Sequence, residues 1–306
     1  VMSEFLGKGR GHLHELRDQQ GLLRSVIKHV DHISDPTNTP AQINEAFRQM
    51  LSGRPGPASV EMCWDTMAKT HEVEIGQANS IIDKPEVDLD AITDAAKLIK
   101  NAKNIMIMCG GGALHASNEV LELAELLRVP ATAFRGGRGV VPEDHMCGTS
   151  AAAARILWDS TDVLIGIGSR LEMQYMRWGP WDKYLACPPP GSPKLIRIDV
   201  DPLEMTRFQP DIGIVADAVD GTRALIDEIG RRGCRAGDLD RISAAKAIAH
   251  KNIRDDIQPQ MEYLDTMREV LPRDGVFVEE LCQVGFAANF GFPIYEPRTY
   301  ITTGYQ

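Results

Sequence analysis

Three short apolar runs decide the fold of this chain: Asn104-Ile-Met-Ile-Met-Cys109, Asp162-Val-Leu-Ile-Gly-Ile167 and Lys194-Leu-Ile-Arg-Ile-Asp199. Continuous apolar runs of this length are typical of strands buried on both faces, as in a parallel sheet covered by helices. Each run ends in, or is followed by, glycine or aspartate, so these residues fall at the carboxyl ends of the predicted strands. Ligands of open α/β sheets bind at that edge.

Segments with helical periodicity alternate with strand-like runs around this unit. We predict strands at 104–109, 130–134, 163–167, 195–200 and 212–215, and helices at 88–101, 117–127, 151–158 and 220–231. Ser117 is the expected N-cap of its helix, because serine side chains accept the first free backbone N–H groups. This alternation predicts a doubly wound parallel sheet.

Shorter α/β patterns flank the sheet on both sides. Before it we predict helices at 13–23 and 40–51 and strands at 26–30 and 58–62. After it we predict helices at 243–252 and 258–270, a strand at 276–278, the start of a helix at 279–286 and a strand at 299–302. The predicted fold class is therefore α/β, with a doubly wound parallel sheet flanked by parts of two further α/β domains.

Composition excludes several classes of partner. The chain has 306 residues and a net charge of −10, without the basic stripe that tracks a nucleic-acid backbone. It has no apolar run long enough to cross a bilayer. The six cysteines are scattered, without a Cys-x-x-Cys pair, which favours reduced thiols. We expect a cytoplasmic protein that binds neither nucleic acid nor membrane.

The triplet Gly110-Gly111-Gly112 is the first candidate binding segment. Glycines after a buried strand let a ligand approach the backbone, and the start of the next helix favours an anion. The triplet is not the Gly-x-Gly-x-x-Gly dinucleotide fingerprint. A tight strand-to-helix turn explains it equally well.

A second candidate segment, Gly168-Ser169-Arg170, follows the next run. An arginine beside a glycine-bearing strand end suits a phosphate or a carboxylate, although it could also pair with a surface acid. Asp199 ends the third run, where a carboxylate could bind the hydroxyls of a ribose. For Asp201, which precedes a proline, we expect a helix-capping role instead.

Histidines near the start of the chain do not predict a metal site. His12, His14 and Glu15 lie close together, as do His29 and His32. Their spacings match neither His-Glu-x-x-His nor a zinc ligand set. We expect no metal ligands among them.

Several segments, in order, resemble the motifs of one enzyme family. The turn Gly53-Arg-Pro-Gly-Pro57 with the strand up to Asp65 resembles a signature of thiamine-diphosphate enzymes of the acetolactate synthase and 2-oxo-acid decarboxylase group. The other matching segments are His14-Glu15 with Asp18, Gly110–Ala113, Gly136–His145, Asp162–Arg170, Arg197–Pro202 and Pro297–Gly304. The order and spacing of these segments make the resemblance specific, and it covers nearly the whole chain.

The resemblance implies a division into domains. Residues 1–67 would be the C-terminal part of a pyrimidine-binding domain and 68–87 a linker. Residues 88–232 would form the central, nucleotide-binding-like domain, 233–257 a second linker and 258–306 the beginning of a diphosphate-binding domain.

The resemblance also implies cofactors and activity. The family uses thiamine diphosphate and Mg²⁺ to decarboxylate 2-oxo acids and join carbon units, in homodimers or homotetramers. The family's catalytic glutamate would lie before Val1 and its Gly-Asp-Gly magnesium motif after Gln306, so no catalytic residue or metal ligand falls in this chain. His14 and Glu15 would lie near the active site. We expect the 306 residues alone to be inactive.

The central domain of the family can hold FAD, and here the motif departs from the family pattern. The segment reads Gly168-Ser-Arg-Leu-Glu-Met-Gln174, without the second arginine of the family, so FAD, ADP or no ligand remain open. Two other readings are a stand-alone module that binds FAD, ADP or NAD without carbon–carbon chemistry, and a structural or dimerisation subunit.

Overall fold

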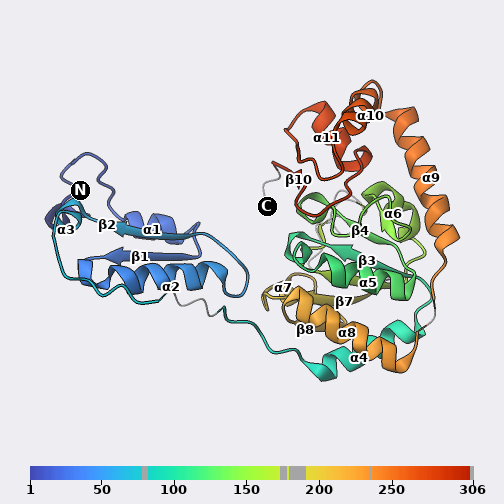
Figure 1. Ribbon diagram of the computed structural model, residues 1–306, viewed down its shortest axis with the longest axis horizontal. Helices are drawn as coiled ribbons and strands as arrows, with labels where there is room; N and C mark the ends of the chain where they lie inside the picture. Colours follow the sequence, from blue (N-terminus) through green and yellow to red (C-terminus); the bar gives the residue numbers. More distant parts are fainter. Residues whose placement is uncertain (78–81, 173–177, 179–190, 235, 304–306) are drawn as a thin grey trace. The chain divides into compact units, whose positions relative to one another are not determined.

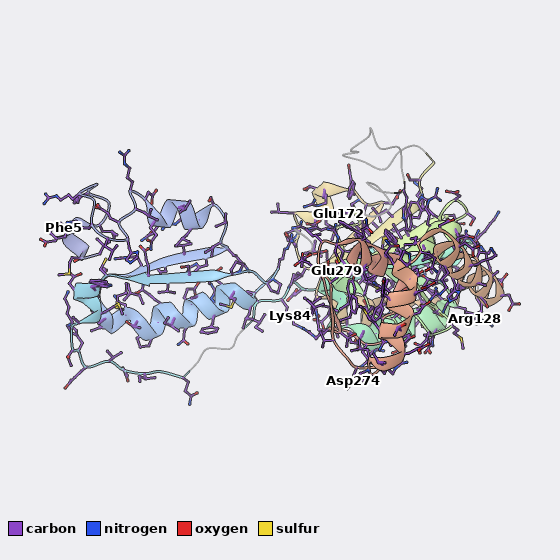
Figure 2. All side chains as sticks on the ribbon, turned by 90° about the horizontal axis from the view of Figure 1, so that it is seen from above. Phe5, Lys84, Arg128, Glu172, Asp274 and Glu279 are labelled. Atoms are coloured by element: carbon purple, nitrogen blue, oxygen red, sulfur yellow. The ribbon has the colours of Figure 1, made fainter. Side chains whose placement is uncertain are left out.

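The computed structural model describes residues 1–77, 82–172, 178, 191–234 and 236–303. The chain divides into two compact units, Val1–Lys84 and Pro85–Gln306 (Figure 1). Figure 2 draws the side chains of both units and labels Lys84, the last residue of the first. In the described residues, no helix combines the length and the apolar character that crossing a bilayer requires.

The helices are α1 (Gln19–Arg24), α2 (Thr39–Leu51), α3 (Trp64–Met67), α4 (Leu89–Asn101), α5 (Ser117–Leu127), α6 (Ala151–Trp158), α7 (Glu204–Arg207), α8 (Ala218–Arg232), α9 (Leu239–Asp256), α10 (Gln260–Val270) and α11 (Gln283–Gly291). The strands are β1 (His29–Ile33), β2 (Ala58–Met62), β3 (Ile105–Cys109), β4 (Ala131–Ala133), β5 (Gly148–Thr149), β6 (Val163–Ile167), β7 (Lys194–Asp199), β8 (Ile212–Val215), β9 (Phe277–Val278) and β10 (Tyr300–Ile301). Short 3₁₀ turns are η1 (Ser3–Phe5), η2 (Pro36–Asn38), η3 (Gly111–Ala113) and η4 (Arg135–Gly137).

In the first unit, β1 and β2 form a parallel pair, with His29 opposite Ala58 and Ile33 opposite Met62. The helix α2 packs on both strands and α1 on β1. The helix predicted from residue 13 begins only at Gln19, so that part of the prediction is wrong. His14 has a left-handed backbone, φ 65°, which interrupts a helix.

One strand of the first unit begins later in the sequence than predicted. The strand predicted at 26–30 lies three residues later, at His29–Ile33, because Val26 and Ile27 instead close the end of α1 by donating to Leu23 O. The turn before β2 is held by Lys28, whose Nζ donates to Arg54 O at 2.9 Å and to Ser52 O.

The second unit contains a six-stranded parallel sheet in the order β5-β4-β3-β6-β7-β8. The predicted α/β class with a doubly wound parallel sheet is confirmed. The two-residue strand β5 was not predicted. Ser117 begins α5 but makes no capping hydrogen bond, so its predicted N-cap role is wrong.

Alternate residues of β3 enter different cores, which explains its continuous apolar sequence. Ile105 and Ile107 pack in the core under α4, α5 and α8, whereas Met106 and Met108 pack in the core under α6 and α9. Both faces of the strand are therefore covered, as the apolar run predicts.

The last part of the second unit has its own small core. Met261, Leu264, Phe292 and Tyr300 pack together from α10, the end of α11 and β10. The helix predicted at 243–252 extends over Leu239–Asp256, and the helix expected from 279 begins at Gln283. Figure 1 shows α9 running past α6 and leading to α10 and α11.

Candidate functional site

The sheet has a topological switch point between β3 and β6. From β3 the sheet extends through β4 and β5 on one side and through β6, β7 and β8 on the other. In open α/β sheets the crevice at such a point is where ligands bind. The two candidate segments follow β3 and β6, and the structure places them in contact: Gly110 N donates to Ile167 O at 3.0 Å.

Three of the expected glycines serve this contact between the two turns. Gly112 N donates to Gly168 O at 3.1 Å. A Cβ on Gly110 would lie 2.2 Å from Gly168 O, and a Cβ on Gly168 would lie 2.5 Å from the carbonyl carbon of Gly112. Gly111 differs, because a Cβ there would meet no atom nearer than 3.8 Å. Of these four candidate glycines, Gly111 alone leaves room beside the backbone for a ligand.

The backbone of Ser169 is held by a buried arginine that was not among the predicted site residues. Arg197 projects from β7 with a side chain only 1% exposed, and its Nη2 donates to Ser169 O at 2.6 Å. The Ser169 hydroxyl accepts the N–H of Leu171 at 3.2 Å. A charged residue inside the apolar run Leu195–Ile198 is the signal that could have identified Arg197, because buried charges need partners.

Glu204 is the carboxylate that these arginines share. Its side chain is 5% exposed and lies 3.2 Å from Arg197 Nη2 and 3.0 Å from Arg207 Nε. Arg170 Nε is farther away, 3.8 Å from Glu204 Oε1, and its side chain is 33% exposed. Arg170 thus has a buried acid beside it and still faces solvent in part.

Asp199 ends β7 at the same edge. Burial raises the pKa of its carboxyl group, and the N–H of Asp201 donates to its Oδ1 at 3.0 Å, which acts in the opposite direction. The side chain of Asp201 accepts the N–H of Leu203 at 2.9 Å in the turn before α7. The N-cap of α7 is Leu203, however, so the predicted helix-capping role of Asp201 is wrong.

A histidine–carboxylate pair, not predicted from the sequence, lies beyond η3. His115 Nε2 is 3.1 Å from Asp217 Oδ2, and Asp217 also caps α8 by accepting the N–H of Val219 at 3.0 Å. The pair ties the turn after β3 to the start of α8.

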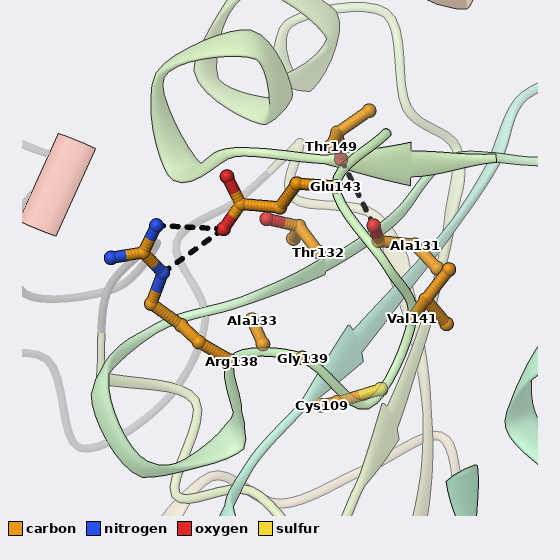
Figure 3. Close-up of a pocket in the computed structure, with 9 residues that line it drawn as sticks. All are labelled: Cys109, Ala131, Thr132, Ala133, Arg138, Gly139, Val141, Glu143 and Thr149. Atoms are coloured by element: carbon orange, nitrogen blue, oxygen red, sulfur yellow. Dashed lines mark hydrogen bonds and ion pairs between the residues drawn. The ribbon is translucent and has the colours of Figure 1, made fainter. Parts of the chain in front are cut away.

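The end of β4 borders a small enclosed cavity, which Figure 3 shows. Arg138 lies beside it and donates from Nε and Nη2 to Glu143 Oε1 at 3.0 and 2.8 Å. The cavity measures about 10 Å³, the space of a single water molecule. Burial raises the pKa of the Cys109 thiol to about 12, so the thiol stays protonated at neutral pH. The cavity cannot hold a cofactor.

His14 and Glu15 make a local turn in the first unit. The carboxylate of Glu15 accepts the N–H groups of His12 at 3.0 Å and Gly9 at 2.6 Å. These backbone hydrogen bonds, above all that of His12, lower the pKa of Glu15. The described contacts assign the two residues a structural role in this turn.

Comparison with known proteins gives a family match for part of the second unit. Residues 92–225 match the family described as thiamine pyrophosphate enzyme, central domain; thiamine pyrophosphate is thiamine diphosphate. The chain is 26% identical to a probable 2-ketoarginine decarboxylase of Pseudomonas aeruginosa, over 99% of this chain and 54% of that protein. It is 26% identical to a glyoxylate carboligase of Escherichia coli, over 94% of this chain and 50% of that protein.

A probable acetolactate synthase large subunit of Methanocaldococcus jannaschii is 32% identical over 68% of this chain and 37% of that protein. The chain spans about half the length of the curated relatives that it matches along most of its own length. The predicted resemblance is confirmed: residues 92–225 of this chain are the central domain of a thiamine pyrophosphate enzyme.

Proposed function

We propose that the chain is part of a thiamine-diphosphate-dependent enzyme that acts on 2-oxo acids, by decarboxylation and joining of carbon units. One observation carries the proposal: the similarity to a decarboxylase and a carboligase extends over 99% and 94% of the chain, well beyond the central domain. Extended similarity of this kind favours the enzyme over a stand-alone nucleotide-binding module or a purely structural subunit.

The described residues do not fit the metal–diphosphate part of the cofactor. Magnesium in such sites is bound through carboxylate and other oxygen ligands. Among the described residues, no group of three or more histidine, cysteine, aspartate or glutamate side chains could hold a metal ion. We therefore assign no metal ligand to the described residues and derive no catalytic step from them. When bound, thiamine diphosphate itself supplies the chemistry that stabilises the carbanion.

For the central domain, the role in keeping with its geometry is binding of a nucleotide such as ADP or FAD at the switch point. Gly111 would give the phosphates access to the backbone, and Arg170 and Ser169 would contact them. The carboxylate of Asp199 would accept hydrogen bonds from the ribose hydroxyl groups. Gly110, Gly112 and Gly168 would shape the turn instead of touching the ligand, because each is already in contact with backbone.

The division into domains follows from the same proposal. Residues 1–67 would belong to a pyrimidine-binding domain, 88–232 to the central domain and 258–306 to a diphosphate-binding domain. His14 and Glu15 would then lie near the active site of the assembled enzyme, which we propose to be a homodimer or homotetramer. Light scattering on the full-length gene product measures that state directly.

The activity is tested with the full-length gene product and three 2-oxo acids: pyruvate, glyoxylate and 2-ketoarginine. We expect release of carbon dioxide from at least one, dependent on added thiamine diphosphate and Mg²⁺. Absence of thiamine-dependent turnover, together with tight binding of ADP or FAD, would instead favour the nucleotide-binding module.

A further inference from the structure

An open cavity of about 570 Å³ lies between α9, α10, the end of α11 and the loop before α6. In Figure 1, α9 runs past α6, and α10 and α11 lie near its far end. The volume falls within the roughly 300–1,000 Å³ that is usual for small-molecule sites. None of the residues considered above for the nucleotide lines it.

Three of the four carboxylates at this cavity are already paired with arginines. Glu143 Oε1 lies 2.8 Å from Arg138, which lies outside the cavity lining. Asp144 Oδ2 is 2.6 Å from Arg273, also outside the lining. The remaining pair is inside the lining: Asp265 accepts from Arg254 Nε at 3.0 Å. Glu269 is the exception, exposed on α10.

Two cationic side chains at the cavity, Lys246 and Arg268, are held by backbone oxygens instead of carboxylates. Lys246 Nζ donates to two backbone oxygens, Glu143 O at 2.8 Å and His145 O at 2.9 Å. Arg268 donates to Leu271 O at 2.6 Å, Pro272 O at 2.7 Å and Pro293 O at 3.3 Å. Among the described residues neither has a carboxylate within salt-bridge distance.

One face of α9 supplies three of the polar side chains that line the cavity. Lys246, His250 and Arg254 follow one another at intervals of four residues, so they share the face that lines the cavity. Lys246 is half-buried, and burial lowers the pKa of its ammonium group. A charge that burial disfavours is stabilised by an anion placed beside it.

We propose that this cavity binds a small organic anion bearing a carboxylate or phosphate group, held by Lys246, Arg268 and His250. Carbonyl oxygens orient the two permanent cations without neutralising them, so their charge is available to the ligand. Three of the four nearby carboxylates are held by arginines, and among the described residues none forms an ion pair with Lys246 or Arg268. The inference stands apart from the proposed function and uses none of its residues.

Isothermal titration calorimetry on the 306-residue chain tests the site, with malonate and inorganic phosphate as probes at constant ionic strength. We expect saturable binding of at least one probe; malonate alone identifies a carboxylate ligand and phosphate alone a phosphate ligand. Lys246→Met should weaken binding at least about tenfold, because a charge-assisted hydrogen bond is lost. Glu269→Gln should tighten it about two- to threefold, since it removes the unpaired carboxylate.

Lys251→Met is the matched control, the same substitution on the same helix, at an exposed lysine that pairs with Asp255. Its binding should stay within about twofold of the parent chain. If Lys246→Met lowers the melting temperature, His250→Gln decides instead: weaker binding supports the site, and unchanged binding overturns it. The proposal is also overturned if neither probe binds, if both lysine variants weaken binding equally, or if Glu269→Gln does not tighten it.

Discussion

At the scale of single residues, the carboxyl edge of the sheet depends on a buried arginine. Arg197 joins the Ser169 turn of β6 to Glu204 beyond β7, and its side chain is almost completely buried. Removing one partner of a buried ion pair leaves an incompletely compensated charge, which is far costlier than losing an exposed pair.

Arg197→Met should therefore lower the free energy of unfolding by about 3–5 kcal/mol. Arg207→Met is the control, because Arg207 contacts the same Glu204 from a side chain that is 40% exposed. Arg207→Met should lower the free energy of unfolding by less than about 1 kcal/mol. Urea unfolding measures both; equal losses would show that burial of Arg197 is not the cause.

Asp199 gives a dependence of stability on pH. Burial raises the pKa of its carboxyl group in the folded chain, so the folded state binds the proton more tightly than the unfolded state. The contribution of Asp199 to the free energy of unfolding therefore falls as pH rises from the unfolded pKa of about 3.9 through the raised folded pKa. Above the folded pKa that contribution no longer changes with pH.

Asp199→Asn should remove this unfavourable contribution while keeping the side-chain oxygen that accepts from Asp201 N. The variant should become more stable relative to the parent as the pH rises through that window. Denaturant unfolding at a series of pH values checks the difference. A difference that stays constant across the window, or that reverses in sign, would contradict the assignment.

At the scale of elements, the turns after β3 and β6 form one interlocked unit. Gly168 has φ +54° and its Cβ position is filled by the backbone of Gly112, whereas Gly111 has open space. Gly168→Ala should cost more than about 2 kcal/mol of stability, and Gly111→Ala less than about 1 kcal/mol. Thermal unfolding of the two variants tests this, and similar losses would refute the difference in packing.

Arg138, in the loop after β4, connects the sheet to α11 and β10. Its Nη1 donates to Ala288 O at 2.9 Å, its Nη2 donates to Phe292 O, and its guanidinium lies 4.5 Å from the centre of the Tyr300 ring. Arg138→Met should raise amide hydrogen exchange in α11 and β10 while β3 and β6 keep their protection. Arg155→Met, which breaks an exposed ion pair with Asp159, should leave both regions unchanged. Equal exchange in the two variants would argue against this role.

The elements differ in how well the sequence predicts them. The strands β3, β6 and β7 were predictable because both of their faces are covered, which makes their sequences continuously apolar. The strand β5 has only two residues, too few for a pattern, and α1 begins late because His14 adopts a left-handed conformation. Such features depend on local backbone geometry, which periodicity does not report.

The candidate site was predictable in position but not in detail. The glycines of both candidate segments lie at the carboxyl ends of β3 and β6, as predicted. Whether a glycine faces a ligand or another turn depends on which strands are neighbours, and that emerges only when β3 and β6 pair. The acid beside Arg170 is likewise Glu204, which the local sequence does not identify as a contact.

At the scale of the whole molecule, the chain matches only part of the length of its relatives. The relatives that match 94–99% of the chain are about twice its length, and the described residues contain no cluster that could hold a metal. The proposed function therefore assigns binding of the cofactor to the full-length protein, as an expectation, and not to the 306 residues alone.

Titration of thiamine diphosphate with Mg²⁺ into the full-length gene product, and in parallel into the 306-residue chain, tests this account most directly. Calorimetry should show saturable, magnesium-dependent binding to the full-length protein and none to the 306 residues. Saturable binding to the 306-residue chain, or no binding to the full-length protein, would contradict it.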